Sequence, residues 1–261
     1  MKYWFAVGLL LCVGLVQAAG PRLAIIIDDV GNDYVQAQQV LELPVGVTVA
    51  ILPQLHNSSR IARQAHGQGR EVMLHQPMQS IRHRKMGPGG LTLHHSQAEI
   101  RKVMSDNLDS VPHVAGINNH MGSLLTRDPN SMRWLMDVLK QRELFFIDSR
   151  TDSSTHAEVV ARESGLFTAR RDVFIDHDRS PEAIRAQLQL ALQLAHKRGS
   201  AIAIGHPYPD TLAVLKELLP QWQAQGVQLV PASQIIAYQR SPESWHASSS
   251  PLPRVAKNSK R

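Results

Sequence analysis

The chain of 261 residues contains a single cysteine, Cys12, and only 5% of its residues are aromatic. One cysteine cannot form a disulfide within the chain, so a small disulfide-stapled scaffold is excluded. The sequence has no Gly-x-Ser-x-Gly segment, which argues against the nucleophile elbow of serine hydrolases. It also lacks zinc-finger spacing, an aromatic RNA-binding signature and a sustained basic helix, so we expect no nucleic-acid partner.

Residues 1–18 are typical of a secretory signal peptide. Lys2 provides a positive start, residues 4–16 are almost wholly apolar, and cleavage after Ala18 fits the residues at that position. The apolar run is shorter than the roughly 20 residues of a membrane-spanning helix, although a retained anchor is the alternative. We expect export to the bacterial cell envelope, in the periplasm or outside the cell, without stable membrane insertion. Cleavage would also remove Cys12 and with it any thiolate chemistry.

The far end of the chain, residues 241–261, is basic and rich in Ser and Pro. Such a segment is typical of a solvated, disordered tail, which could also contact anionic envelope polymers. No internal linker divides the remaining residues, 19–240. We therefore expect one folded domain between a signal peptide and a basic tail, and nothing in the sequence indicates an oligomeric state.

Short apolar runs recur along this domain and indicate strands that are buried on both faces of a parallel sheet. They occupy residues 22–27, 45–52, 71–74, 114–117, 144–147, 171–175, 201–205 and 227–230.

Helical patterns with clear start signals alternate with these runs. Ser96 and Glu99 form a capping box, and the pairs Asp128-Pro129 and Ser180-Pro181 each begin an amphipathic stretch. Gly199 lies where the third of these helices should end, and Asp210 is placed to cap a fourth. Seven or eight βα units in about 220 residues predict a single distorted (β/α)7-8 barrel.

Polar residues follow the apolar runs at the ends that meet on one face of such a barrel. Any one of them could simply cap a helix or bond a carbonyl, but the whole set indicates a site. The set comprises Asp28, Asp29, His75, Asn118, His120, Asp148, Asp176 and His206.

Two histidines and one carboxylate are a common protein ligand set for a catalytic divalent ion, with Zn²⁺ as the first candidate. Asp29, His75 and His120 can supply these ligands. Such an ion lowers the pKa of bound water and polarises a carbonyl group. Asp28 would then be available as a general base, and His206 could protonate a leaving group. This combination predicts a metal-dependent hydrolase.

Several motifs resemble the divergent branch of the polysaccharide deacetylases, in unbroken order from Pro21 to Tyr238. The segment Ile25–Gly31 resembles the Asp-Asp opening motif of polysaccharide deacetylases in general. The segments that resemble the divergent branch are 71–78, 87–89, 116–123, 146–151 and 203–207.

The resemblance implies a distorted βα barrel, with Asp28 as catalytic base, Asp29 as metal ligand and His206 as general acid. Asp148 corresponds to a position that supports the base. Typical members carry a second ligand histidine four residues after the first, where this chain has Gln79. They also carry Arg-x-Pro where this chain has Asn118-Asn119-His120, and we expect His120 to replace the missing ligand.

The function expected from the residues and the resemblance is removal of acetyl groups from an envelope or extracellular polysaccharide. One alternative is an altered barrel that binds a glycan or an envelope protein without turnover. A second alternative is a metal hydrolase of another amide or of a phosphoester. Arg82, Arg84 and Lys85, beside a glycine-rich loop, could then meet an anionic substrate, although a solvated loop also explains them.

Overall fold

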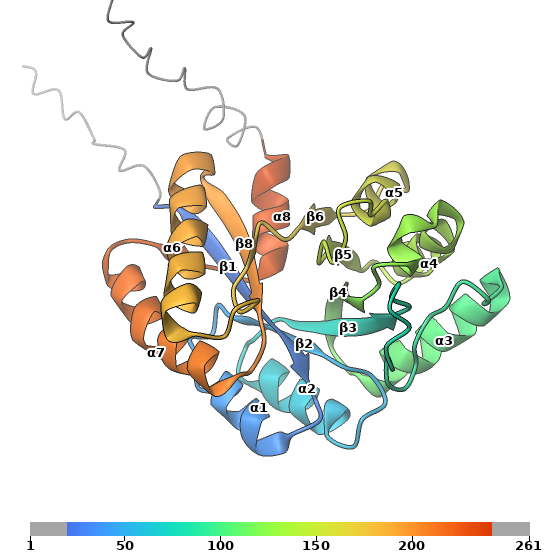
Figure 1. Ribbon diagram of the computed structural model, residues 1–261, viewed down its shortest axis with the longest axis horizontal. Coiled ribbons are helices and arrows are strands. Elements are labelled where there is room, and N and C mark those ends of the chain that lie inside the picture. Colours follow the sequence, from blue (N-terminus) through green and yellow to red (C-terminus); the bar gives the residue numbers. More distant parts are fainter. Residues whose placement is uncertain (1–19, 242–261) are drawn as a thin grey trace, which may run out of the picture.

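The computed structural model describes residues 20–241 (Figure 1). The predicted signal peptide lies outside this part of the chain, as does the predicted basic tail apart from its first residue, Ser241. Within residues 20–241, no helix is both long and apolar enough to cross a membrane.

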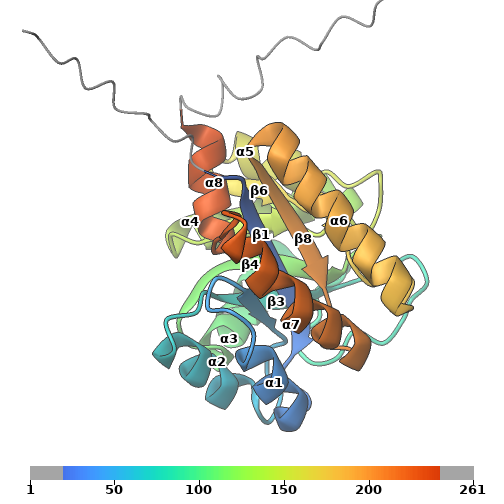
Figure 2. The ribbon, with the colours of Figure 1, turned by 90° about the vertical axis from the view of Figure 1, so that its left-hand side faces the viewer.

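The strands form one curled parallel sheet, a half-barrel, so the predicted single-domain distorted barrel is confirmed (Figures 1 and 2). The order along the sheet is β6-β5-β4-β3-β2-β1-β8-β7, and β9 pairs with β1. The strands are β1 (Arg22–Val30), β2 (Thr48–Ile51), β3 (Val72–Met78), β4 (Val114–Met121), β5 (Phe145–Asp148), β6 (Thr168–Arg170), β7 (Val173–Phe174), β8 (Ser200–Gly205) and β9 (Gln228–Leu229).

Helices alternate with the strands, and all except α8 cover the outside of the curled sheet; Figure 2 shows α6 lying along β8. The helices are α1 (Tyr34–Leu41), α2 (Ser58–Gly67), α3 (Gln97–Ser110), η1 (Leu125–Arg127), α4 (Pro129–Gln141), α5 (Ala157–Glu163), α6 (Pro181–Arg198), α7 (Pro209–Ala224) and α8 (Ala232–Arg240).

Side chains alternate between the two faces of each strand, and this alternation divides the core in two. In β1, Leu23, Ile25 and Ile27 belong to the larger cluster, which the outer helices cover. Ala24 and Ile26 belong to the smaller cluster inside the half-barrel. The inner cluster also includes Met73, Phe145, Ile147, Ile202, Ile204 and the α8 residues Ile235 and Ile236. Helix α8 thus fills the base of the half-barrel. The upper part of the half-barrel remains open for polar side chains.

The helix starts at Ser96, Asp128 and Ser180 are confirmed, and Gly199 ends α6 in the left-handed conformation with φ 81°. The prediction for Asp210 was wrong. The N-cap of α7 is Tyr208, and Asp210 lies in the first turn, where a negative charge still favours the helix dipole.

Two other features of the strands differ from expectation. The three-residue strand β6 was missed because Thr168–Arg170 carries no apolar run. Strands β1, β3 and β4 continue through the polar residues that the apolar pattern placed after them. Asp28, His75 and His120 therefore lie within strands, where the sheet sets the direction of each side chain.

Candidate metal and acid-base site

The inward-facing row of several strands ends in a polar side chain. In β1, Ala24 and Ile26 point into the half-barrel, and Asp28 follows two positions later. The same step of two residues leads from Met73 to His75, and from Ile204 to His206. Because side chains alternate along a strand, these polar groups form the top layer of the barrel interior.

Asp29 reaches the same layer by a break in this alternation. Its φ angle is 57°, in the left-handed region that residues other than glycine seldom occupy, and the register between β1 and β2 shifts between Ile27 and Val30. As a result both carboxylates approach one ring: Oδ1 of Asp28 lies 3.6 Å from Nδ1 of His75, and Oδ1 of Asp29 lies 3.2 Å from its Nε2. Regular alternation would have pointed Asp29 away.

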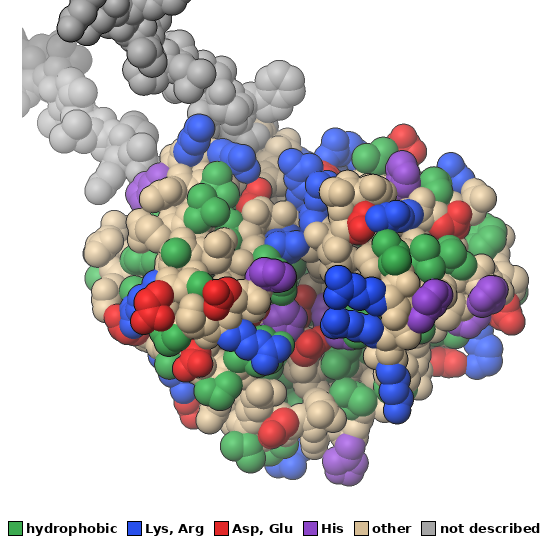
Figure 3. All heavy atoms as spheres, viewed as in Figure 1, with side chains coloured by type: hydrophobic (Ala, Val, Ile, Leu, Met, Phe, Trp, Pro, Cys, Tyr) green, Lys and Arg blue, Asp and Glu red, His purple; other side chains and the backbone are tan. Residues whose placement is uncertain are grey.

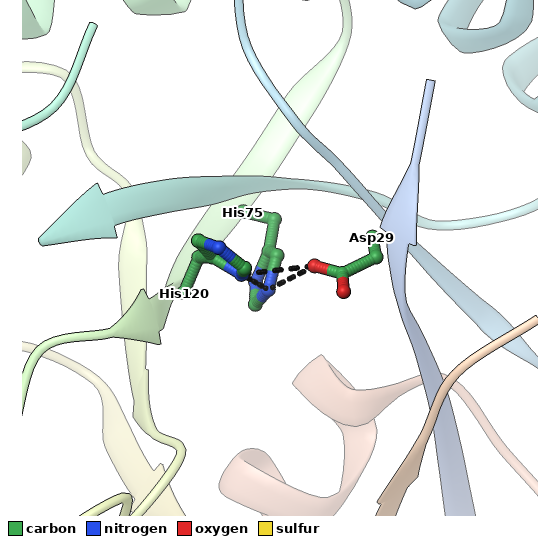
Figure 4. A group of neighbouring side chains, drawn as sticks. All are labelled: Asp29, His75 and His120. Atoms are coloured by element: carbon green, nitrogen blue, oxygen red, sulfur yellow. Dashed lines mark hydrogen bonds and ion pairs between the residues drawn. The ribbon is translucent and has the colours of Figure 1, made fainter. Parts of the chain in front are cut away.

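The three predicted metal ligands converge on one point (Figure 4). Nδ1 of His120 lies 2.9 Å from Oδ1 of Asp29 and 3.1 Å from Nε2 of His75. Such separations suit atoms that share one ion at roughly 2.0–2.2 Å. Oδ1 of Asp29 is buried, and neither ring nitrogen meets it with hydrogen-bond geometry. A buried carboxylate oxygen without a donor is unfavourable, and a cation would satisfy it.

Asn118 determines which nitrogen of His75 is free. Its amide nitrogen donates to Oδ1 of Asp28 across 2.7 Å, so its oxygen faces His75. Nδ1 of His75 lies 2.8 Å from that oxygen and donates its hydrogen to it. The lone pair of His75 is then on Nε2, which faces Asp29 and His120, as in metal sites where a hydrogen bond on the far nitrogen orients the ligand.

The site attracts positive charge. Burial alone would lower the pKa of His75, but the charges of Asp28 and Asp29, helped by Asn118, raise it to about 9. Burial opposes ionisation of Asp29, yet its contacts with His120 and His75 hold the pKa of Asp29 well below its ordinary value. The potential that retains a proton here also favours a divalent cation.

Asp28 lies deeper, with 3% of its surface exposed. Burial raises its pKa above the ordinary value, although His75, His206 and the bond from Asn118 oppose that rise. A carboxylate whose pKa is moved toward neutrality is a better general base than an ordinary one.

His206 is oriented by Asp176. Nδ1 of His206 lies 2.9 Å from Oδ1 of Asp176, whose Oδ2 accepts bonds from the His206 backbone N–H and the Thr211 hydroxyl. Burial disfavours the charged ring, but Asp176 and the more distant Asp28 raise the pKa of His206. Nε2 of His206 lies 3.8 Å from Oδ2 of Asp29, so a protonated His206 stands beside the ligand group.

The structure does not bring Asp148 to this cluster. Phe145 and Ile147 of β5 face the barrel interior, so alternation turns Asp148 to the other face. The carboxylate is fully buried, where it accepts the Arg150 backbone N–H at 2.8 Å and the Thr155 hydroxyl at 3.0 Å. These contacts shape the turn after β5, and none of them reaches Asp28.

Two recesses open from the site, and Figure 3 shows the hollowed face with histidine and acidic side chains inside and Lys or Arg side chains beside them. The larger, about 570 Å³, is lined by many charged side chains, which include Asp28, Asp29, His120, Arg150, Arg171, Arg179 and His206. The smaller, about 350 Å³, shares Asp29, His120 and His206 but is lined mainly by apolar groups that include Leu55, Pro77, Met86, Pro88 and Pro207.

Sequence reasoning noticed Asn118 and Asp176 as strand-end residues but did not identify their roles in holding His75 and His206. It missed Arg150, Arg171, Arg179 and Tyr208 in the lining of the larger recess. Arg150 lies in the family-like segment 146–151, but no sequence pattern groups these four residues, since they come together only when the sheet curls.

Comparison with known proteins gives the site a family context. The model of the divergent polysaccharide deacetylase family matches residues 25–236. An uncharacterized protein of Haemophilus influenzae is 38% identical over 198 residues, which cover 76% of this chain and 71% of that protein. The uncharacterized protein YibQ of Escherichia coli is 37% identical over 198 residues, which cover 76% and 62% of the two chains.

Solved structures share the fold at lower identity. The uncharacterized protein ATU2773 from Agrobacterium tumefaciens superposes with a TM-score of 0.80 at 19% identity, covering 84% of this chain and 90% of that one. The peptidoglycan deacetylase PdaC from Bacillus subtilis superposes with a TM-score of 0.54 at 15% identity, covering 88% of this chain and 98% of that one. BA3943, a CE4 family pseudoenzyme from Bacillus anthracis, superposes with a TM-score of 0.50 at 14% identity, covering 83% of this chain and 66% of that one.

The family match spans the half-barrel from β1 to α8 and includes every strand whose inward row ends in a residue of the site. The chain therefore belongs to the divergent polysaccharide deacetylase family.

Proposed function

We propose that this protein is an exported, metal-dependent hydrolase that removes acetyl groups from an envelope or extracellular polysaccharide. The observation that carries the proposal is the convergence of Asp29, His75 and His120, with a buried carboxylate oxygen that lacks a hydrogen-bond donor. Family membership supports a carbohydrate substrate, and PdaC, which shares the fold, is a deacetylase that acts on peptidoglycan.

Asp29, His75 and His120 would hold the ion, for which Zn²⁺ is the first candidate because nitrogen and carboxylate ligands suit it. When bound, the ion would activate water and polarise the acetyl carbonyl. Asn118 and the sheet hold His75 in the tautomer that presents Nε2. These residues therefore provide a preorganised ligand set.

The two remaining polar groups suit proton transfer. Asp28 is a buried carboxylate of raised pKa beside His75, in the position of a base that accepts a proton from water. His206 is held by Asp176, its Nε2 lies 3.8 Å from Oδ2 of Asp29, and it can donate a proton to the departing amine or alkoxide. A base and an acid on either side of a carbonyl carbon are what hydrolysis of an amide or ester requires.

The predicted signal peptide at residues 1–18 supports export to the periplasm or to the exterior. The second candidate function is glycan binding without turnover. BA3943 shows that a pseudoenzyme can have this fold, and this chain departs from the common ligand motif at Gln79.

The test measures zinc content and acetate release together. Zinc-loaded wild type should release acetate from acetylated chitooligosaccharides, peptidoglycan or an acetylated exopolysaccharide. Asp28→Asn should keep its zinc but lose most activity, whereas Asp29→Asn and His120→Ala should lose zinc. Asp106→Asn, at an exposed carboxylate of α3, serves as the matched control and should change neither.

If wild type releases no more acetate than Asp28→Asn on any of these substrates, the catalytic proposal fails. Glycan affinity that survives Asp28→Asn and His206→Ala, without turnover in wild type, would favour the binding protein. Zinc bound at full stoichiometry by His120→Ala would remove His120 from the ligand set.

A further inference from the structure

We propose that the larger recess binds a negatively charged group of the substrate, so that the protein acts on an anionic glycan. This inference rests on the proposed function and concerns which glycan is recognised. The recess of about 570 Å³ contains Asp29 and His120 of the metal site, and its lining also includes Arg84, Arg150, Arg171 and Arg179. A ligand whose acetyl group lies at the ion would have its neighbouring groups among these arginines.

Within residues 20–241, the guanidinium of Arg171 forms no ion pair. Its Nε donates to the Ser149 carbonyl at 2.6 Å, its Nη2 donates to the Arg150 carbonyl at 2.9 Å, and its guanidinium carbon lies 4.8 Å from the centre of the Phe174 ring. Neutral carbonyls hold the group in place, and the charges of Asp28 and Asp148 act on it from a distance without forming an ion pair. A guanidinium held in this way is prepared for an anion.

Arg150 and Arg179 also lack an ion pair within the part of the chain that the structure describes. Arg150 has the left-handed φ of 51°, its backbone N–H is held by Asp148, and its side chain has no ion pair within the described residues. The guanidinium of Arg179 lies 3.8 Å from the centre of the Tyr208 ring and donates to the Tyr208 hydroxyl at 2.8 Å.

Some arginines outside the recess do pair with carboxylates. Arg127, Arg162, Arg185 and Arg198 each lie within 3.1 Å of a carboxylate oxygen. Others, such as Arg70, are held by backbone carbonyls without an ion pair within the described residues, so what distinguishes the recess is that four arginines gather in one lining.

The acidic groups in the same recess are already occupied. Asp28 bonds to Asn118, Asp176 bonds to His206, and Asp29 belongs to the ligand group. Once a divalent ion compensates Asp29, four guanidinium groups face two carboxylates, so the recess carries excess positive charge. A carboxylate or phosphate matches the planar fork of arginine, and a recess of this size falls in the range of small-ligand sites.

The test compares matched glycans by calorimetric titration of zinc-loaded Asp28→Asn protein, which should bind with little turnover. Hyaluronan tetrasaccharide and N-acetylated chitotetraose have the same length and both carry N-acetyl groups, but only the first carries carboxylates. We expect hyaluronan to bind about tenfold more tightly at low salt, with the difference shrinking as salt rises. The same titration with N-acetylglucosamine 6-phosphate and with N-acetylglucosamine compares their affinities and tests whether the recess recognises a phosphate.

The variants Arg150→Gln and Arg179→Gln, made in the same Asp28→Asn background, should each lose most of the preference for the charged ligand while affinity for the neutral one stays the same. Arg82→Gln in that background is the matched control, because Arg82 lies on the loop of Arg84 but does not line the recess. Circular dichroism establishes that each variant is folded. Two variants on different turns ensure that misfolding of one does not remove the test.

Equal affinity for charged and neutral ligands, no binding of either charged ligand, or a preference unchanged in both arginine variants would overturn the inference. Acetate release by wild type is measured separately. Release from neutral glycans with no charge preference leaves the deacetylase proposal standing and this inference refuted. A charge preference with no acetate release from any glycan would support the anionic recess and refute the deacetylase proposal.

Discussion

Nδ1 of His75 donates its hydrogen to Oδ1 of Asn118 across 2.8 Å, and the same Asn118 amide donates to Asp28. One side chain thus links the predicted base to a predicted ligand and presents the free nitrogen of His75 to Asp29 and His120. Its orientation follows from charge: a carboxylate only accepts hydrogen bonds, so the amide can meet it only with its nitrogen.

Replacing Asn118 by Ala should weaken zinc binding by roughly 10–100-fold, because His75 would lose the bond that selects its tautomer. Asn118→Asp, which can still accept from Nδ1, should retain more affinity than Asn118→Ala. Competition with a fluorescent chelator measures the dissociation constants. Equal affinities in wild type and Asn118→Ala would show that the sheet alone orients His75.

Replacing Asp176 by Asn should alter general-acid catalysis by His206 while zinc remains bound. The Asp176 carboxylate raises the pKa of His206, so the neutral amide of the Asp176→Asn variant should lower that pKa. The alkaline limb of the kcat profile, which reports loss of the protonated acid, should then move to lower pH, and kcat should fall more than KM rises. Rates measured between pH 5 and 10 test this, and a profile that only scales down without shifting would contradict it.

Metal-free protein should lose stability as pH rises from 6.5 to about 9. The folded pKa of His75 is raised from 6.5 to about 9, so its stabilising contribution is complete below 6.5 and is lost as pH rises through the folded value. Urea unfolding of chelator-treated protein measures the trend. His75→Gln should flatten it, and so should zinc, which needs the neutral ring. A trend of equal slope in wild type and His75→Gln would refute the assignment.

Asp148→Ala should lower stability by about 1–3 kcal/mol and leave zinc affinity unchanged. The substitution leaves the Arg150 N–H and the Thr155 hydroxyl without their acceptor in a buried turn. Thermal unfolding measures the stability of the variant, and competition with a chelator measures its zinc affinity. If zinc affinity or the pKa of Asp28 shifts substantially without a loss of stability, then Asp148 supports the base, as the resemblance implied.

Much of the fold could be predicted because its signals are local. The apolar runs gave most of the strands, and the side chains at Ser96, Asp128 and Ser180 mark helix starts that depend only on neighbouring residues. Strand β6 could not be found this way, since Thr168–Arg170 pairs with β5 through its backbone and carries little apolar surface. The N-cap of α7, Tyr208, forms no side-chain cap hydrogen bond, so only Pro209 at the first helical position marks that start in the sequence.

The site could be predicted in part for a similar reason. Asp28, His75, His120 and His206 continue the inward-facing row of their strands, so period-two alternation brings them to one layer. Alternation also applies to Asp148, but it turns this side chain to the outer face because Phe145 and Ile147 face inward. The sequence does not show which face of β5 points into the half-barrel.

The sequence by itself determined the alternation of strands and helices, the family, and the residue types gathered at the open end of the half-barrel. Only the tertiary structure decided that Asp29 joins His75 and His120, through a left-handed turn that local propensity disfavours. It also decided that Arg150, Arg171 and Arg179 share one recess with that site. The physical reason is that alternation and capping are set by neighbours in the chain, whereas a metal site and its recess depend on how a curled sheet brings distant strands together.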